Sequence, residues 1–211
     1  MDSPPLEVKV WGPYACFTRP EMKVERVSYT VMTPSAARGI LEAIFWKPEF
    51  SWRVQEIWVL NPIRYFSILR NEVQSKASPR TDRPYYADED RTQRHTLALR
   101  DVAYVIRADI AVRSHCSADP AKFRDQFRRR VQRGQCFHRP ALGCREFAAD
   151  FSLPAPDDRP LESPRRLELG LMLFDLKYSG EAGPHAPRFF EATLEQGVLH
   201  VPPSLCREVS G

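Results

Sequence analysis

The chain opens with alternating apolar and polar residues. Residues 6–11 repeat with a period of two, which predicts a half-buried β-strand. A helix is predicted to begin at Thr33-Pro34, because threonine is suited to cap a helix and proline to occupy its first turn. Lys47-Pro48 ends the predicted helix. Its apolar stripe consists of Ala37, Ile40, Leu41 and Ile44.

The middle of the chain predicts further strands and one long loop. Residues 53–68 are rich in β-branched and aromatic residues, and Pro62 marks a break or an edge in this strand region. Residues 71–96 are polar and charged, which predicts a long surface loop. Apolar residues at every second position then predict the clearest strand of the chain, at residues 102–112.

A second helix is predicted to start at Asp119-Pro120, another pair that combines a capping residue with proline. Its buried stripe and the glycine expected just past its end are Phe123, Phe127, Val131 and Gly134. With a strand at residues 142–147, the order becomes strand, helix, strand, strand, helix, strand. This order is typical of a ferredoxin-like, or RNA-recognition-like, α+β domain.

Proline-rich sequence divides the chain into parts. Residues 1–150 are predicted to form the ferredoxin-like domain, and residues 151–165 are predicted to be a linker. Residues 166–211 predict a small antiparallel β-sheet, with a strand at 167–178 and a hairpin around Glu195-Gln196-Gly197. This segment is short, so we expect it to pack against the first domain.

Composition is that of an ordinary globular protein. Of the 211 residues, 43% are hydrophobic and 27% are charged, and no apolar run is long enough to cross a membrane. The first residues lack the pattern of a signal peptide, and five irregularly spaced cysteines do not suggest a disulfide framework. We therefore expect a cytoplasmic protein with no membrane partner.

Positive charge is concentrated in residues 122–145. Eight basic residues and one acid, Asp125, give this segment a net charge of +7, whereas the whole chain carries +4. Arginine outnumbers lysine by 25 to 6, and its planar fork suits phosphate. A solvated helix face would normally include acidic residues, so we expect a nucleic-acid contact. The predicted RNA-binding residues are Arg124, Arg128, Arg129, Arg130, Arg133, Arg139 and Arg145.

Two histidines flank this basic segment. His115 precedes it and His138 lies near its end. Histidine can accept or donate a proton near neutral pH, although a loop histidine without chemistry is the alternative for each. The cysteines near His138 lack the C-x2-C spacing of a zinc site, and motifs for nucleotide phosphates are absent. The sequence therefore predicts no metal and no other cofactor.

Several segments taken together resemble a known family. They are residues 12–20 (GPYACFTRP), 28–31 with 33–40, 45–48 (FWKP) and 143–146 (GCRE). In this order they are similar to motifs of the type I-C CRISPR-associated endoribonucleases, the d-type branch of the fifth Cas protein. The resemblance covers most of residues 6–150.

The resemblance implies an RNA-recognition-like fold and metal-independent cleavage of the CRISPR repeat transcript. In that reaction the RNA 2′-hydroxyl attacks the adjacent phosphorus, which requires a base, an acid and a cation. The family's Tyr, Lys and His positions match Phe45, Lys122 and Phe123, so only the lysine is retained. The candidate catalytic residues are therefore Lys122, His115, His138 and Tyr14.

The resemblance also implies partners, and two other functions stay open. The implied partners are CRISPR repeat RNA and the other subunits of a type I-C surveillance complex, and the basic surface is also compatible with duplex DNA. Because Phe45 and Phe123 cannot transfer protons, the chain could instead hold the 5′ tag of the guide RNA without cutting it. The third interpretation is a ferredoxin-like interaction module, against which the arginine-rich segment argues.

Overall fold

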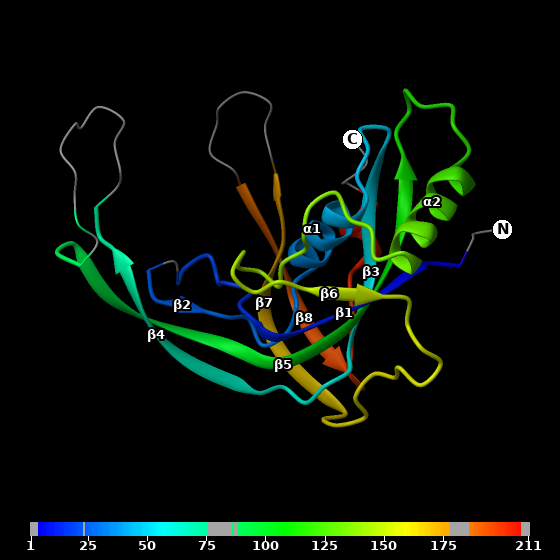
Figure 1. The fold of residues 1–211 in the computed structure, drawn as a ribbon. Coiled ribbons are helices and arrows are strands. Elements are labelled where there is room, and N and C mark those ends of the chain that lie inside the picture. Colours follow the sequence, from blue (N-terminus) through cyan, green and yellow to red (C-terminus); the bar gives the residue numbers. More distant parts are fainter. Residues whose placement is uncertain (1–3, 23, 76–85, 87, 178–185, 208–211) are drawn as a thin grey trace.

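A ferredoxin-like unit forms the centre of the computed structural model, which describes the chain except residues 1–3, 23, 76–85, 87, 178–185 and 208–211 (Figure 1). Its four strands lie in the order β6-β1-β5-β3, and each is antiparallel to its neighbour. This order confirms the predicted α+β fold class. The unit consists of β1 (Leu6–Ala15), α1 (Pro34–Ile44), β3 (Phe50–Val59), β5 (Arg91–Val112), α2 (Pro120–Gln132) and β6 (Asp150–Ser152).

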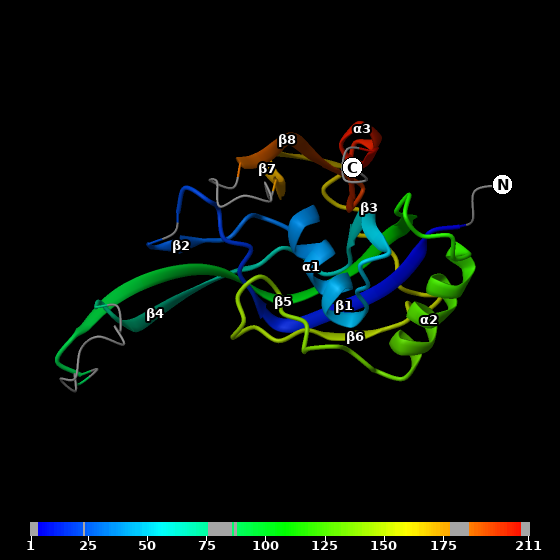
Figure 2. The ribbon, with the colours of Figure 1, turned by 90° about the horizontal axis from the view of Figure 1, so that it is seen from above.

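A long hairpin extends from this unit. Strand β4 (Tyr65–Val73) pairs antiparallel with the first half of β5, and β2 (Arg26–Val27) pairs parallel with it. The hairpin extends well beyond the body of the protein in both Figure 1 and Figure 2. The prediction of a loop at residues 71–96 is therefore wrong at both ends, where the chain forms the end of β4 and the start of β5. Most of the centre of this segment lies outside the described residues. Because polar residues lie on both faces of this hairpin, the sequence there lacks the alternation of apolar and polar residues that predicts a strand.

The C-terminal strands extend the same sheet. They are β7 (Arg166–Lys177), β8 (Ala186–Glu195) and β9 (Val198–His200), followed by the short helix α3 (Pro203–Arg207). Strand β9 pairs with β3 and with β8, and β8 pairs with β7. The predicted hairpin is confirmed, and the segment packs on the first domain through backbone hydrogen bonds. The domain boundaries at residues 150 and 165 stay a prediction.

Both predicted helices are confirmed with their caps. The Thr33 hydroxyl accepts a hydrogen bond from the amide of Ala36 at 3.2 Å, and Asp119 accepts one from the amide of Ala121 at 2.9 Å. Helices α1 and α2 bury their apolar stripes in one core with β1, β3 and β5. At its centre Phe127 packs edge-on against Trp52, with 4.8 Å between the ring centroids. No helix in the described part of the chain is long and apolar enough to cross a membrane.

Residues 142–147 form a tight loop, so the predicted strand there is wrong. The loop closes through backbone hydrogen bonds from Leu142 to Phe147 at 2.7 Å and from Phe147 to Cys144 at 3.0 Å. Gly143 has a φ of +88°, which interrupts an extended chain. This loop lies against the end of β1, where the amide of Cys16 donates to the carbonyl of Leu142 at 3.0 Å.

Candidate functional site

A cleft of about 810 Å³ opens beside the N-terminal part of α1. Ser35 and Ala36 of α1 line one side, and Thr18, which follows β1, lines another. The remaining wall comes from the segment between α2 and β6, which contributes His138 and Arg145. Pockets of ~300–1,000 Å³ are typical of sites for small ligands, so the cleft has room for a nucleotide.

Three cationic or titratable side chains from the segment between α2 and β6 line this cleft. His138, Arg139 and Arg145 are all exposed to solvent there. Arg139 also pairs with Asp150 at 3.5 Å, but the two side chains are 70% and 60% exposed. Solvent screens such a pair, so a bound anion can compete for Arg139. The arrangement suits a phosphate group.

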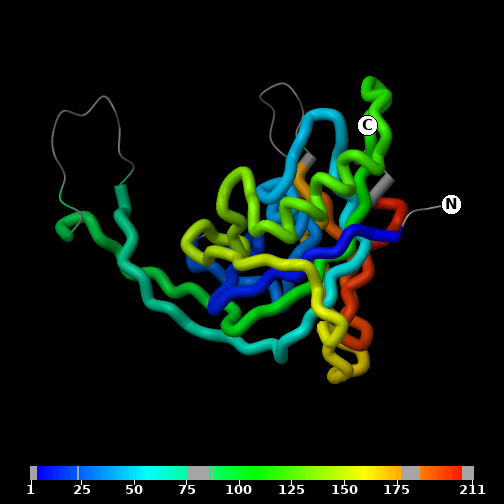
Figure 3. Tube along the Cα trace, turned by 45° about the vertical axis from the view of Figure 1, so that its right-hand side comes forward, coloured from blue at the N-terminus to red at the C-terminus, as the bar shows by residue number. Residues whose placement is uncertain are grey.

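The position of His138 is set by the C-terminal end of α1. The amides of Phe137 and His138 both donate to the carbonyl of Ala43, at 2.8 and 3.3 Å. Arg130 donates to the neighbouring carbonyl of Ile44 at 2.8 Å. The last carbonyls of a helix lack intrahelical partners, so these donors stabilise the end of α1. The trace in Figure 3 follows this segment from α2 toward β6.

Two of the predicted RNA-binding arginines support the fold. Arg124 is 8% exposed, pairs with Asp109 at 3.2 Å and donates to the carbonyl of Pro4, so its expected place on the outer face of α2 is wrong. Arg130 is half-buried and lies over the ring of Phe45, with 5.4 Å from its guanidinium carbon to the ring centroid. Their donors are directed at protein groups rather than at solvent.

The other arginines of α2 face solvent. Arg128, Arg129 and Arg133 are exposed, and Arg128 lies 3.6 Å from the exposed carboxylate of Asp125. None of the three lines the cleft. They stay predicted RNA contacts on an outer surface, separate from the cleft wall that Arg139 and Arg145 form.

Of the four candidate catalytic residues, His138 alone is part of the cleft lining. His115 and Lys122 are exposed near the start of α2. Tyr14 is 37% exposed on β1, and its ring stacks on that of Phe66 at 5.2 Å. The structure therefore does not gather the four side chains around this cavity.

Phe45 and Phe123, the two positions that the resemblance matches to a tyrosine and a histidine of the family, lie in the core. Phe45 is 1% exposed and Phe123 is 2% exposed. Both pack against Phe50, each with 5.3 Å between ring centroids. The ammonium of Lys47 lies 5.7 Å from the centre of the Phe123 ring. Phe45 and Phe123 thus belong to one aromatic cluster, with the Lys47 ammonium beside it.

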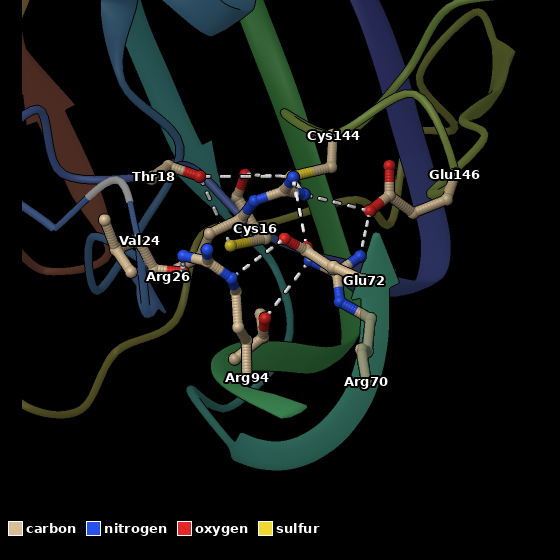
Figure 4. A network of polar contacts seen from close by, with 10 residues as sticks. Cys16, Thr18, Val24, Arg26, Arg70, Glu72, Arg94, Cys144 and Glu146 are labelled. Atoms are coloured by element: carbon tan, nitrogen blue, oxygen red, sulfur yellow. Dashed lines mark hydrogen bonds and ion pairs between the residues drawn. The ribbon is translucent and has the colours of Figure 1, made fainter. Parts of the chain in front are cut away.

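A polar network beside the cleft was missed by the sequence reasoning. Figure 4 shows Cys144 next to Arg26, whose guanidinium donates to the Cys144 sulfur at 3.6 Å and to Glu146 at 3.2 Å. Arg70 also pairs with Glu146. Cys16 and Cys144 both stand in segments that resemble family motifs, which was the available signal. Among the described residues, no group of three or more His, Cys, Asp or Glu is placed to hold a metal ion.

Comparison with known proteins decides the family. A family model described as "CRISPR-associated protein (Cas_Cas5)", for the Cas5d branch, matches residues 5–202. The chain belongs to the Cas5d family. It is 46% identical to the "CRISPR pre-crRNA endoribonuclease Cas5d" of Thermus thermophilus, over 97% of this chain and 94% of that one. The protein of the same name from Mannheimia succiniciproducens is also 46% identical, over 97% of each chain.

Solved structures show the same fold for this Cas5d-family chain. One, titled "Crystal Structure of CRISPR-associated Protein", has a TM-score of 0.70 and 24% identity, over 95% of this chain and 92% of that one. A chain of a "CRISPR RNA-guided surveillance complex" has a TM-score of 0.54 and 12% identity, over 95% and 92%. At these identities the likeness is one of fold.

Proposed function

We propose that this protein is an endoribonuclease that cuts pre-crRNA within the CRISPR repeat, and that the repeat binds in the cleft beside α1. Two curated relatives with this activity in their names are 46% identical over nearly the whole chain. The observation that carries the proposal is the convergence of His138, Arg139 and Arg145 on one cleft wall. An imidazole and two guanidiniums supply one proton-transferring group and the positive charge that cleavage of an RNA phosphodiester requires.

In the proposed reaction, the RNA 2′-hydroxyl attacks the adjacent phosphorus. A 2′,3′-cyclic phosphate forms, the bond to the 5′ oxygen breaks, and that oxygen takes up a proton. His138 is the candidate for moving one of the two protons. Arg139 and Arg145 stabilise the added negative charge of the phosphorane. The N-terminal end of α1, where Ser35 lines the cleft, adds the positive partial charge of the helix dipole.

The proposed function also uses surfaces outside the cleft. The exposed arginines of α2 hold RNA beyond the cleft, with Arg128, Arg129 and Arg133 as the contacts. After cleavage the protein stays on the 5′ tag as a subunit of a type I-C surveillance complex in the cytoplasm. The proposed reaction has no metal step, since His138 and the two guanidiniums are assigned the proton transfer and the charge stabilisation.

A second function is favoured by the burial of Phe45 and Phe123. Phenyl rings at these positions neither donate nor accept protons, so the chain could hold guide RNA without cutting it. In that case Arg139 and Arg145 bind the 5′ tag, and His138 adds only a hydrogen bond. The two functions share the same RNA-binding surface and differ in proton transfer.

One cleavage assay separates these functions. Repeat RNA from the CRISPR array of the same organism is incubated with the protein in EDTA, beside the same RNA with a 2′-deoxy nucleotide at the scissile position. We expect cleavage of the first RNA to a 2′,3′-cyclic phosphate and no cleavage of the second. Binding of both RNAs without cleavage of either would establish the non-catalytic function.

The variant His138→Ala tests the proposed proton transfer. We expect the cleavage rate to fall at least ~100-fold while RNA affinity changes little, because general acid–base catalysis contributes ~10²–10⁴. His200→Ala is the matched control, since His200 is an exposed histidine on β9, outside the cleft lining. An unchanged rate in His138→Ala would remove His138 from the mechanism.

A further inference from the structure

Two cysteines from distant parts of the chain lie close together beside the cleft, whose lining includes Cys16. Cys16 follows β1, and Cys144 lies 128 residues later in the loop before β6. The amide of Cys16 donates a hydrogen bond to the carbonyl of Leu142 at 3.0 Å. The Cys144 thiol donates to the carbonyl of Cys16 at 3.7 Å. A Cβ on Gly143 would stand 2.0 Å from that carbonyl oxygen. The two segments therefore approach as closely as their backbones allow.

The two thiols share one polar neighbour. Both sulfurs lie near the Thr18 hydroxyl, at 3.5 Å from Cys16 and 3.9 Å from Cys144 (Figure 4). Cys16 is fully buried, whereas Cys144 is partly exposed. A reagent from solvent therefore reaches Cys144 first.

The surroundings give the two thiols different acidities. The hydrogen bond with Cys16 lowers the pKa of Cys144, and Thr18 and Arg26 add to this effect against burial and the charge of Glu146. The same hydrogen bond and burial raise the pKa of Cys16. The guanidinium of Arg26, 3.6 Å from the Cys144 sulfur, favours the thiolate form of Cys144, whereas burial favours the protonated form of Cys16. A thiolate next to a thiol is the arrangement that favours reversible oxidation.

We propose that Cys144 and Cys16 form a redox modification site, in which a hydroperoxide oxidises Cys144 and Cys16 closes a disulfide with it. In the first step the Cys144 thiolate attacks the terminal peroxide oxygen, the O–O bond breaks, and hydroxide or alkoxide leaves. Cys144 becomes a sulfenic acid and the peroxide is reduced. In the second step the Cys16 sulfur displaces the sulfenic oxygen as water, and the S–S bond forms.

The disulfide would change the wall of the cleft. Cys16, Gly143 and Arg145 all line it, so the new bond ties the loop that presents Arg145 to the end of β1. It also removes the negative charge that faces Arg26, leaving this guanidinium with Glu72 at 3.5 Å and Glu146. The proposal stands on this geometry and does not require that the protein cuts RNA.

Peptide mapping of the intact chain tests the disulfide. Cys116, Cys136 and Cys206 are first changed to serine, so that only the proposed pair remains. Folded protein is treated with hydrogen peroxide, blocked with iodoacetamide under denaturing conditions and digested without reductant. We expect a linked peptide containing Cys16 and Cys144, two hydrogens lighter than its parts, that dithiothreitol separates. Recovery of both cysteines as free, alkylated thiols would overturn the proposal.

Single variants assign the two steps. With Cys16→Ser, dimedone added together with the peroxide should label Cys144, because the sulfenic acid has no resolving thiol. With Cys144→Ser, Cys16 should stay reduced under the same exposure, because it is buried and protonated. Dimedone labelling of Cys16 rather than Cys144 would reverse the assigned order and contradict the proposal. A circular dichroism spectrum of each variant establishes that it is folded before the peroxide is added.

Discussion

Arg130 lies over the ring of Phe45 and donates a hydrogen bond to the carbonyl of the residue before it, Ile44. One guanidinium thus joins the arginine-rich helix α2 to the end of α1. The loop that follows α2 then bonds to Ala43 and brings His138 to the cleft. Arg130, which the sequence predicted to bind phosphate, therefore stabilises the end of α1, to which the backbone of the candidate catalytic His138 is bonded.

Replacing Arg130 should destabilise the protein. Arg130→Ala loses a hydrogen bond from a charged donor and a cation–π contact, which together stabilise by about 2 kcal/mol. Arg129→Ala is the matched control, because Arg129 is exposed on the same helix turn. Urea unfolding measures both free energies. Equal values for the two variants would show that the contacts of Arg130 contribute nothing.

Gly143 is expected to tolerate no side chain. Gly143→Ala places a Cβ on the Cys16 carbonyl and holds an L-residue at a φ of +88°. Gly134→Ala is the control, since Gly134 has a φ of +63° and no atom within 4 Å of its added Cβ. The left-handed backbone costs each variant roughly 1–2 kcal/mol, and only Gly143→Ala adds a clash. Thermal unfolding should rank Gly143→Ala well below Gly134→Ala, and the reverse order would contradict the observed contact.

If the match implied by the resemblance is right, placing a tyrosine and a histidine at Phe45 and Phe123 should raise the rate of RNA cleavage. In Phe45→Tyr with Phe123→His, a hydroxyl and an imidazole replace two rings that both pack on Phe50. We expect at least a ~10-fold higher rate in the repeat-RNA assay, since acid–base groups contribute ~10²–10⁴. Phe50→Tyr adds a hydroxyl to the same cluster outside the family positions and should give no gain. If the double variant folds and cuts no faster, proton transfer runs through other groups.

The Cys144 thiol should react with iodoacetamide at a lower pH than an ordinary thiol. The hydrogen bond with Cys16 lowers the pKa of Cys144 to about 6, so its thiolate fraction rises through that pH. The charged groups of this network are Arg26 on β2, Arg70 and Glu72 on β4, Arg94 on β5, and Glu146. Alkylation rates from pH 5 to 9 measure the midpoint for Cys144, with exposed Cys136 as the internal reference.

Removal of a contact should shift this midpoint. Arg26→Gln loses the guanidinium 3.6 Å from the sulfur, so the midpoint for Cys144 should move to a higher pH while that for Cys136 stays in place. A wild-type midpoint equal to that of Cys136 would show that the surroundings do not stabilise the thiolate.

Acid should weaken the fold in part through Glu56 on β3. Burial opposes ionisation of Glu56, but hydrogen bonds from Trp58 and Arg107 and the charge of Arg107 lower its pKa overall. A carboxylate whose pKa is lower in the folded state stabilises the fold above pH 4.5 and loses this effect as the pH falls through the folded pKa.

The variant Glu56→Gln measures this contribution. It should unfold more easily than wild type at pH 7, and the difference should shrink at pH 3. Urea unfolding at the two pH values measures it, with exposed Glu191→Gln on β8 as the control. A difference that grows toward pH 3 would reverse the predicted sign.

Short-range patterns predicted most of the elements that build the fold. Thr33-Pro34 and Asp119-Pro120 marked both helix starts, because capping depends on residues within one turn. Alternation predicted β1, which buries one face, and the core half of β5, although residues 102–106 are buried on both faces. The family resemblance supplied Lys122, Phe45 and Phe123 as positions of interest, and the structure exposes the lysine and buries the two rings.

Only the tertiary structure decided which of these side chains share a site. The sequence placed Arg124 in a uniform arginine row, but the packing of α2 on β5 turned it toward Asp109 and away from solvent. His138 reached the cleft through Ala43, and Cys144 reached Cys16 across 128 residues. Periodicity and capping act between neighbours along the chain, whereas these contacts depend on the path of the whole backbone, which no local pattern records.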